Sequence, residues 1–197
     1  MDLFEYQGKS LYQKFNINHP NSKLIKNLND LNDPINLNFP VVVKAQVQVG
    51  GRGKAGGIKV AKDINELTQY SKEILGMDIK GHKVEILLLE EASNILEEYY
   101  ISFTLDRSEK KYLIMLSAKG GMDIEQVAEE NPDDLVKFHV SPSEKLTSST
   151  ISELINKANL NKDHEESLSE IIENLYLMFT EGDCDLVEVN PLAITDN

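Results

Sequence analysis

Residues 40–62 read PVVVKAQVQVGGRGKAGGIKVAK, and this stretch decides the fold. Its first ten residues begin with β-branched side chains and then alternate apolar with polar ones, which predicts a strand. Its last five residues alternate again and predict a second strand. Between the two, residues 50–57 hold five glycines together with Arg52 and Lys54. The pattern therefore predicts a glycine-rich flap between two antiparallel strands.

The composition of the flap indicates a phosphate clamp. Glycines let backbone N–H groups approach anionic oxygens closely, and the two cations supply charge; the alternative is a flexible surface turn. Gly51, Gly53 and Gly56 match the G-x-G-x-x-G fingerprint, but that fingerprint must lead into a helix and these glycines lead into a strand. The P-loop pattern fails as well, because Lys54 is followed by Ala55 rather than by Ser or Thr. What remains is a flap that covers phosphates from above.

Charged residues on the neighbouring strands are further candidates. Lys44 lies inside the strand before the flap, so its ammonium is expected either to face the phosphates from beneath or to face solvent from an edge strand. Glu90 and Glu91 end an apolar strand, and Glu97 and Glu98 begin the next. Carboxylates at strand ends are commonly solvated, but near a nucleotide they could accept hydrogen bonds from base amino groups or ribose hydroxyls.

A second group of polar residues lies near the end of the chain. Glu188 and Asn190 are two apart, so a strand there places them on one face and Val187 and Val189 on the other. Both polar side chains offer the hard oxygen atoms that Mg²⁺ requires. The alternative is a polar, solvated sheet face. Cys184 and the scattered histidines show no ligand spacing and are interpreted as structural.

Composition limits the class of protein. The chain has 197 residues, 41% of them hydrophobic, which suffices for one large domain or two small ones. A net charge of -13 makes nucleic acid and membranes poor partners, because it repels phosphate backbones and anionic lipid. One cysteine excludes an intrachain disulfide and indicates a reducing compartment. The opening MDLFEYQGK is no signal peptide, and no apolar run reaches the ~18 residues of a membrane span, so a cytoplasmic location is expected.

The rest of the chain mixes helical and strand patterns, which predicts an α/β protein. Asp2 and Glu5 form a helix-start pattern of the capping-box type, and residues 16–38 are expected to be loops around one short helix. The chain closes on Asp196-Asn197, which is turn chemistry, so it looks cut in the middle of a hairpin. Helices are expected over 3–15, 63–75, 122–130, 151–158 and 165–180, and strands over 84–91, 98–106, 112–118, 136–140, 184–190 and 192–195.

Together these residues resemble the family of succinyl-CoA synthetase β subunits, which are ATP-grasp proteins. The similar segments are spread over residues 4–195. The resemblance implies an α/β (α+β) ATP-grasp fold over 1–197, in two lobes, with the flap lobe of approximately 20–90 inserted and with the family's C-terminal CoA-ligase domain absent. The segments are FEYQGK, VVVKAQVQVGGRGKAGG, LLLEEASNILEEYYISFTLDRS, GGMDIEQVAEENP and LVEVNPLAIT.

The resemblance also implies a role for nine residues. They would contact a nucleotide, hold a metal ion or support the reaction. By this resemblance Lys44, Gly51, Arg52 and Gly53 would contact nucleotide phosphates, Glu90 and Ser93 would line the base pocket, Glu98 would hold the ribose, Asn190 would ligate Mg²⁺, and Glu188 would steady a phosphorylated histidine of the partner α subunit.

The activity implied by the resemblance is reversible ligation. Succinate, CoA and ATP, or GTP, would give succinyl-CoA, the diphosphate and phosphate, as in the tricarboxylic acid cycle. The alternatives are a related acyl-CoA ligase such as malate–CoA ligase, or a nucleotide-binding or interaction module without turnover of its own. The location would be the mitochondrial matrix in a eukaryote, although no transit peptide is present. The isolated chain is expected to be inactive without its α subunit.

Overall fold

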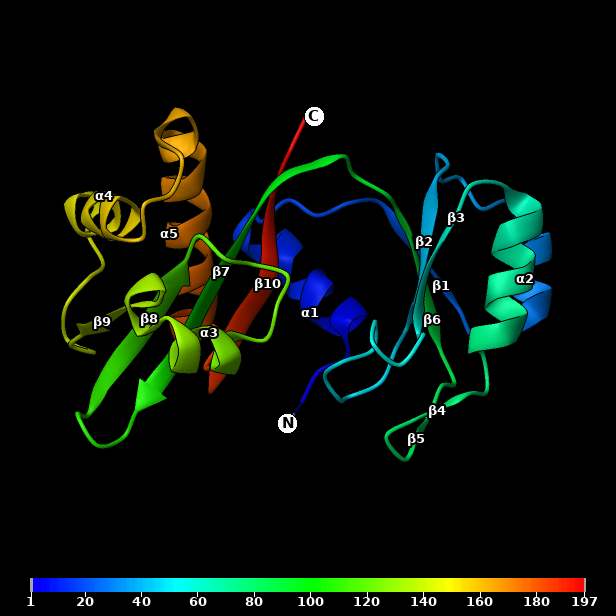
Figure 1. The fold of residues 1–197 in the computed structure, drawn as a ribbon, viewed down its shortest axis with the longest axis horizontal. Helices are drawn as coiled ribbons and strands as arrows, with labels where there is room; N and C mark the ends of the chain where they lie inside the picture. Colours follow the sequence, from blue (N-terminus) through cyan, green and yellow to red (C-terminus); the bar gives the residue numbers. More distant parts are fainter. Residues whose placement is uncertain (1, 197) are drawn as a thin grey trace. The chain divides into compact units, whose positions relative to one another are not determined.

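The computed structural model describes residues 2–196. The chain divides into two compact units (Figure 1). The first unit comprises Met1–Lys14 and Asn18–Ser93, and the second comprises Phe15–Ile17 and Asn94–Asn197. Each unit contains its own antiparallel sheet with helices beside it, so each is described by itself.

The first unit is built on a four-stranded antiparallel sheet. The N-terminal helix α1 (Glu5–Tyr12), continued by the 3-10 helix η1 (Gln13–Phe15), precedes the sheet. Helix α2 (Ile64–Ile74), the 3-10 helix η2 (Leu28–Asn32) and the short hairpin of β4 (Asp78–Ile79) and β5 (His82–Lys83) complete the unit. In spatial order the strands are β1 (Ser22–Ile25), β6 (Leu87–Glu91), β2 (Val41–Ala45) and β3 (Ile58–Ala61).

Alternation along β2 gives the first sheet two different faces. Val41, Val43 and Ala45 are fully buried in the hydrophobic core, which also includes side chains of α2. Lys44 lies between two of these residues in sequence, so its side chain leaves the opposite face of the sheet. The sheet therefore provides a dry face for stability and a second face that can carry charge.

The second unit is also built on a four-stranded antiparallel sheet. Helices α4 (Ser148–Lys157) and α5 (Glu165–Glu181) lie beside it, together with α3 (Ile124–Glu130) and the 3-10 helices η3 (Pro132–Asp134) and η4 (Lys162–His164) (Figure 1). Aromatic rings fix α5 on the sheet, with Phe179 centroids 5.1 Å from Tyr112 and 6.2 Å from Phe103. The strand order is β10 (Leu186–Thr195), β7 (Ile95–Asp106), β8 (Lys111–Ser117) and β9 (Val136–Val140).

Several predicted elements are confirmed by the structure. The flap does join two antiparallel strands, because β2 pairs with β3 up to Lys44 and Ile58. Strands β7 and β8 form the predicted hairpin, and β9 has the predicted bounds. Asp63 begins α2 as expected, since its carboxylate accepts hydrogen bonds from the amides of Asn65 and Glu66.

Other predictions were wrong, mainly at element ends. Strand β1 lies inside the 16–38 segment, which was expected to contain only loops and a helix; its pairing with β6 supplies hydrogen bonds that the sequence does not reveal. Phe4 rather than Asp2 occupies the N-cap position of α1, and its amide donates to Gln7 Oε1 at 2.9 Å. One strand, β10, replaces the two expected ones, with a register shift between Val189 and Leu192. In the described part of the chain, no helix has the length and apolar character needed to cross a membrane.

Candidate functional site

A cluster of five charged side chains covers one face of the first sheet. Lys44 comes from β2, Glu90 from the neighbouring strand β6, Glu5 and Lys9 from one side of α1, and Arg52 from the flap. Lys44 and Lys9 both pair with the carboxylate of Glu90, which is buried. Because β2 is a central strand, the alternative of Lys44 as a solvent-facing edge residue is wrong.

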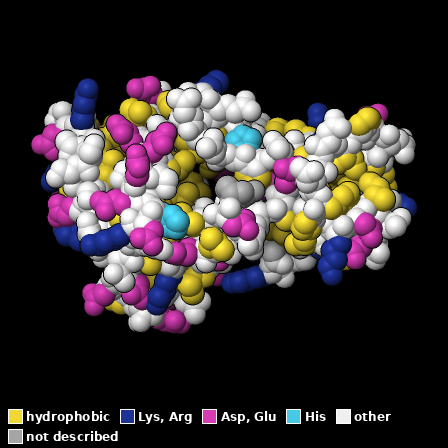
Figure 2. All heavy atoms as spheres, turned by 90° about the horizontal axis from the view of Figure 1, so that it is seen from above, with side chains coloured by type: hydrophobic (Ala, Val, Ile, Leu, Met, Phe, Trp, Pro, Cys, Tyr) yellow, Lys and Arg dark blue, Asp and Glu magenta, His cyan; other side chains and the backbone are white. Residues whose placement is uncertain are grey.

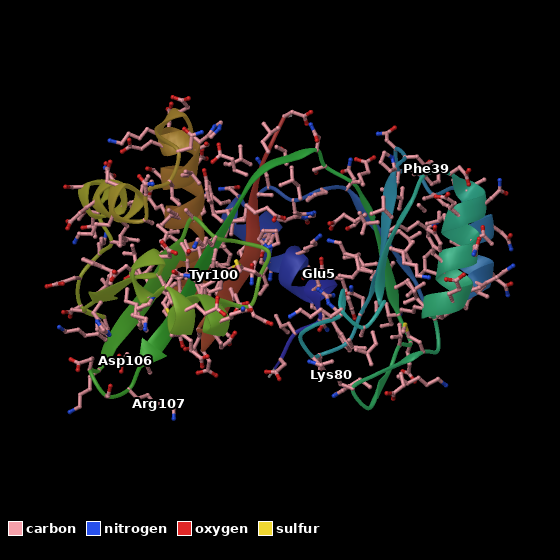
Figure 3. All side chains as sticks on the ribbon, viewed as in Figure 1. Glu5, Phe39, Lys80, Tyr100, Asp106 and Arg107 are labelled. Carbon is pink, nitrogen blue, oxygen red and sulfur yellow. The ribbon has the colours of Figure 1, made fainter. Side chains whose placement is uncertain are left out.

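Glu5 links the cations of this cluster. Its Oε1 lies 3.1 Å from Lys44 Nζ and 3.5 Å from Lys9 Nζ, and its Oε2 lies 2.7 Å from Arg52 Nη1 (Figure 3). Arg52 Nη1 also donates to the carbonyl of Ala45 at 3.0 Å. Lys44 and Arg52, the two cations expected at nucleotide phosphates, therefore both pair with the carboxylate of Glu5.

The cluster shifts the pKa values of its members. Burial alone would raise the pKa of Glu5, but the charges of Lys44, Arg52 and Lys9 outweigh it and lower the pKa from 4.5 to about 2. The pKa of Lys9 falls from 10.5 to about 8, first because burial disfavours its charge and then because Lys44 repels it. Three cations against two carboxylates leave the cluster net positive at neutral pH, which favours an anionic ligand.

The flap adds unused hydrogen-bond donors beside this charge. Its turn is closed by bonds from Ala55 N to Gly51 O and from Gly57 N to Arg52 O, at 3.1 and 2.8 Å. The amides of Gly51, Arg52 and Gly53 donate to no other atom of residues 2–196. Gly51 has a φ of 81°, a conformation that glycine adopts without strain. Such open amides in a turn are suited to bind phosphate oxygens.

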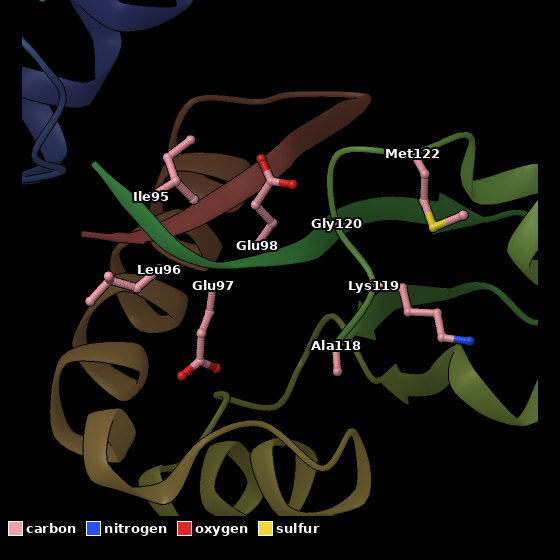
Figure 4. A pocket seen from close by; sticks show the side chains of 8 residues that line it. All are labelled: Ile95, Leu96, Glu97, Glu98, Ala118, Lys119, Gly120 and Met122. Atoms are coloured by element: carbon pink, nitrogen blue, oxygen red, sulfur yellow. The ribbon is translucent and has the colours of Figure 1, made fainter. Parts of the chain in front are cut away.

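In the second unit, the start of β7 borders a depression of about 560 Å³ (Figure 4). Glu97 and Glu98 project from opposite sides of the strand (Figure 4). The carboxylate of Glu97 already accepts hydrogen bonds from the hydroxyl of Tyr99 and from Asn161 Nδ2, whereas Glu98 lies on the other side of the strand (Figure 4). The lining residues are Ile95, Leu96, Glu97, Glu98, Ala118, Lys119, Gly120 and Met122.

Asn190 lies near the same depression and holds the loop at its edge. Its Oδ1 accepts a hydrogen bond from Gly121 N at 2.7 Å, and its Nδ2 donates to Met122 O at 2.9 Å. Gly121 in turn touches Glu98, since a Cβ there would lie 2.6 Å from Glu98 Oε2. Glu98 and Asn190 are 92 positions apart in the sequence, and the structure brings both into contact with Gly121.

The residues at β10 fit a magnesium ion only in part. The Gly121 amide uses one lone pair of Asn190 Oδ1 and leaves the second for a cation. Burial, followed by the charge of Glu125, raises the pKa of the Glu188 carboxyl. Among residues 2–196, no group of three or more His, Cys, Asp or Glu side chains is placed to hold a metal. Any Mg²⁺ here would need oxygens of its nucleotide and water.

The predicted site residues therefore fall into two sets. Lys44, Arg52 and Glu90 meet in the first unit beside Gly51 and Gly53, and Ser93 follows β6 in the same unit. Glu98, Glu188 and Asn190 belong to the second unit. Sequence reasoning treated Glu5 as part of a helix start only and did not consider Lys9. The one available signal was their spacing of four residues, which places both on one side of a helix.

Comparison with known proteins decides the family. The profile of the ATP-grasp domain matches residues 2–194. The chain belongs to the ATP-grasp family. The predicted fold class is thereby confirmed.

The same assignment is supported by curated relatives. The succinate–CoA ligase [ADP-forming] subunit beta of Methanocaldococcus jannaschii is 42% identical over 195 residues, which is 99% of this chain and 53% of that protein. The subunit of the same name from Ignicoccus hospitalis is 41% identical over 197 residues, covering 100% of this chain and 52% of that protein. The resemblance to these β subunits is confirmed, and the chain spans about half the length of the curated relatives that it matches.

Solved structures of lower identity share the fold. A dinucleotide-forming acetyl-coenzyme A synthetase from Ca. Korarchaeum cryptofilum has a TM-score of 0.75 at 19% identity and matches 99% of this chain and 88% of its own. ATP citrate lyase from Methanothrix soehngenii has a TM-score of 0.74 at 20% identity and matches 98% of this chain and 47% of its own. At such identities the likeness shows the fold alone.

The position of Glu5 predicts a pH-dependent contribution to stability. A pKa lowered by folding stabilises the folded state above the ordinary pKa of 4.5, and this stabilisation is lost as the pH falls toward 2. We expect Glu5→Gln to lower the free energy of unfolding by about 1–3 kcal/mol at pH 7, and the difference from wild type to shrink between about pH 5 and 2. Urea unfolding at several pH values measures both.

A matched control is Glu73→Gln in the same unit. Glu73 pairs with Lys59 on the surface, where water screens the charges, so its loss should matter less than that of Glu5. If both variants lower the free energy of unfolding equally at pH 7, the stabilising role of Glu5 is contradicted.

The hydrogen bonds of Asn190 predict local protection from exchange. Asn190→Ala removes the acceptor of Gly121 N, so we expect the Gly121 amide to exchange with solvent about ten times faster. Hydrogen exchange followed by NMR measures this. Asn94→Ala is the control, because Asn94 Nδ2 bonds Asp196 at 2.8 Å in the same unit without touching the 120–122 loop. An unchanged Gly121 rate would show that Asn190 does not hold the loop.

Proposed function

We propose that this chain is the nucleotide-binding part of the β subunit of a succinate–CoA ligase, and that it binds ATP or ADP, or the guanine nucleotides, together with Mg²⁺. The observation that carries the proposal is the similarity, near 40% identity over essentially all of this chain, to about half of each curated β subunit of that enzyme. The net positive cluster around Lys44 and the open flap amides support it, because both suit a phosphate chain.

In the proposed reaction the γ-phosphoryl group passes between ATP and a histidine of an α subunit. The bond from the bridging oxygen to the γ-phosphorus breaks, a phosphorus–nitrogen bond forms, ADP leaves, and the imidazole gives its proton to solvent. Lys44, Arg52 and the flap amides would hold the phosphates in line for this transfer. Glu188 would steady the histidine by accepting a hydrogen bond from its ring.

The remaining predicted residues would orient the nucleotide. Glu90 and Ser93 would contact the base and Glu98 the ribose hydroxyls. Asn190 would offer Oδ1 to Mg²⁺ while still holding the Gly121 amide. When bound, the ion would neutralise charge on the phosphate oxygens.

Two measurements test the proposed function. Calorimetry should show binding of ATP or ADP in the presence of Mg²⁺ and none of NAD, because the flap leads into β3 and not into a helix. Thioester formation from succinate, CoA and ATP should require a matching α subunit, since the phosphorylated histidine would reside there. Tight NAD binding without ATP binding, or full turnover by the chain alone, would contradict the proposal.

The proposed phosphate contacts predict a selective loss of affinity. Lys44→Ala and Arg52→Ala should each weaken ATP by roughly 1.5–3 kcal/mol, because each removes a charge-assisted hydrogen bond to phosphate. Adenosine, which lacks phosphates, should bind equally to wild type and to both variants. Calorimetry with both ligands decides, and equal losses for ATP and adenosine would mean that the two residues only shape the pocket.

A further inference from the structure

We infer that Lys80 is an additional phosphate-binding residue, which the β4–β5 hairpin brings to the flap. Neither the flap motif nor the strand pattern points to this lysine, because it lies 28 positions after Arg52 and 36 positions after Lys44. The inference rests on the proposed function, because it deepens the nucleotide site of the first unit.

The ammonium group of Lys80 lies close to Gly51 in the flap. A Cβ built on Gly51 would lie 3.2 Å from Lys80 Nζ and 3.7 Å from Lys80 Cε. Gly51 is one of the flap residues whose amide donates to no other atom of residues 2–196. The cation therefore lies beside a residue whose amide is unbonded, and a cation and an open amide close together can both bind one phosphate group.

The hairpin that carries Lys80 is firmly attached to the base of the flap. Ile79, the residue before it, is 1% exposed and packs against Gly57, where a Cβ would come within 2.6 Å of Ile79 Cδ1. Hydrogen bonds from Gly76 N to Val84 O at 2.8 Å and from Val84 N to Met77 O at 2.9 Å close the hairpin. The position of Lys80 over the flap thus follows from buried packing next to it.

Lys80 occupies the tip of the β4–β5 hairpin. Lys80 and Gly81 have φ values of 52° and 83°, as a two-residue turn with two left-handed positions requires. Asparagine and glycine adopt this conformation more readily than lysine does. Lys110, in the turn between β7 and β8, has a similar φ of 55°, so the turn positions Lys80 and its role rests on the contacts of its side chain.

Lys80 differs from the other cations in its lack of a carboxylate partner. Lys44 and Arg52 are both paired with Glu5. Within residues 2–196, no Asp or Glu oxygen lies within 4.0 Å of Lys80 Nζ. Its charge is therefore available to a phosphate chain without first breaking an ion pair.

The test compares Lys80→Gln with Lys83→Gln, which removes an exposed lysine from the same hairpin. Calorimetry with ATP and with adenosine should show that Lys80→Gln weakens ATP about five- to tenfold and leaves adenosine unchanged. Lys83→Gln should change neither, and Lys80→Arg should restore most of the ATP affinity. The salt dependence of ATP binding should also be less steep in Lys80→Gln, because one charge fewer takes part.

Inorganic tripolyphosphate separates this inference from the proposed function. Suppose that wild type binds tripolyphosphate but neither ATP nor adenosine, while Lys80→Gln binds tripolyphosphate more weakly. That result would overturn the nucleotide function and retain the role of Lys80. If Lys80→Gln binds ATP as tightly as wild type does, or loses as much affinity for adenosine as for ATP, the role of Lys80 alone is overturned. Thermal unfolding of each variant shows that the hairpin remains folded.

Discussion

The ion pairs of Glu5 with Lys44 and Arg52 organise the first unit. A central strand carries Lys44, the flap carries Arg52 and an N-terminal helix carries Glu5, so one carboxylate ties together three segments that are distant in sequence. The neighbouring carboxylate of Glu90 is buried and pairs with two lysines, which compensates the cost of removing its charge from water. The position of the flap cation over the sheet depends on this arrangement.

The same charges give the site its chemistry. A face with three cations and two carboxylates attracts an anion, whereas the protein as a whole carries a charge of -13. On the face shown in Figure 2, acidic side chains are interspersed with Lys and Arg side chains. Anion binding must therefore come from a local concentration of positive charge and open amides, and the first unit provides both.

The second unit contributes polar groups through a different constraint, which is close backbone packing. The side chain of Asn190 accepts a hydrogen bond from the amide of Gly121 and donates one to the carbonyl of Met122. Gly121 has no side chain and so leaves room for the carboxylate of Glu98. A larger residue at position 121 would displace that carboxylate. The loop and the two polar residues are consequently positioned together, although no sequence motif connects them.

The sequence by itself determined the strand–flap–strand of residues 40–62 and the hairpin of β7 and β8, because alternation and glycine content are local properties. The resemblance of segments along residues 4–195 indicated the family, which the match of the ATP-grasp profile confirms. It also indicated Lys44, Arg52 and Asn190 as candidates, because their side-chain types suit phosphate and metal. Only the tertiary structure decided that Lys44 is on a central strand, that β1 completes the sheet, and that Glu5 lies between the cations. These features depend on contacts between residues far apart in the chain, and periodicity in one segment carries no information about which distant segment packs against it.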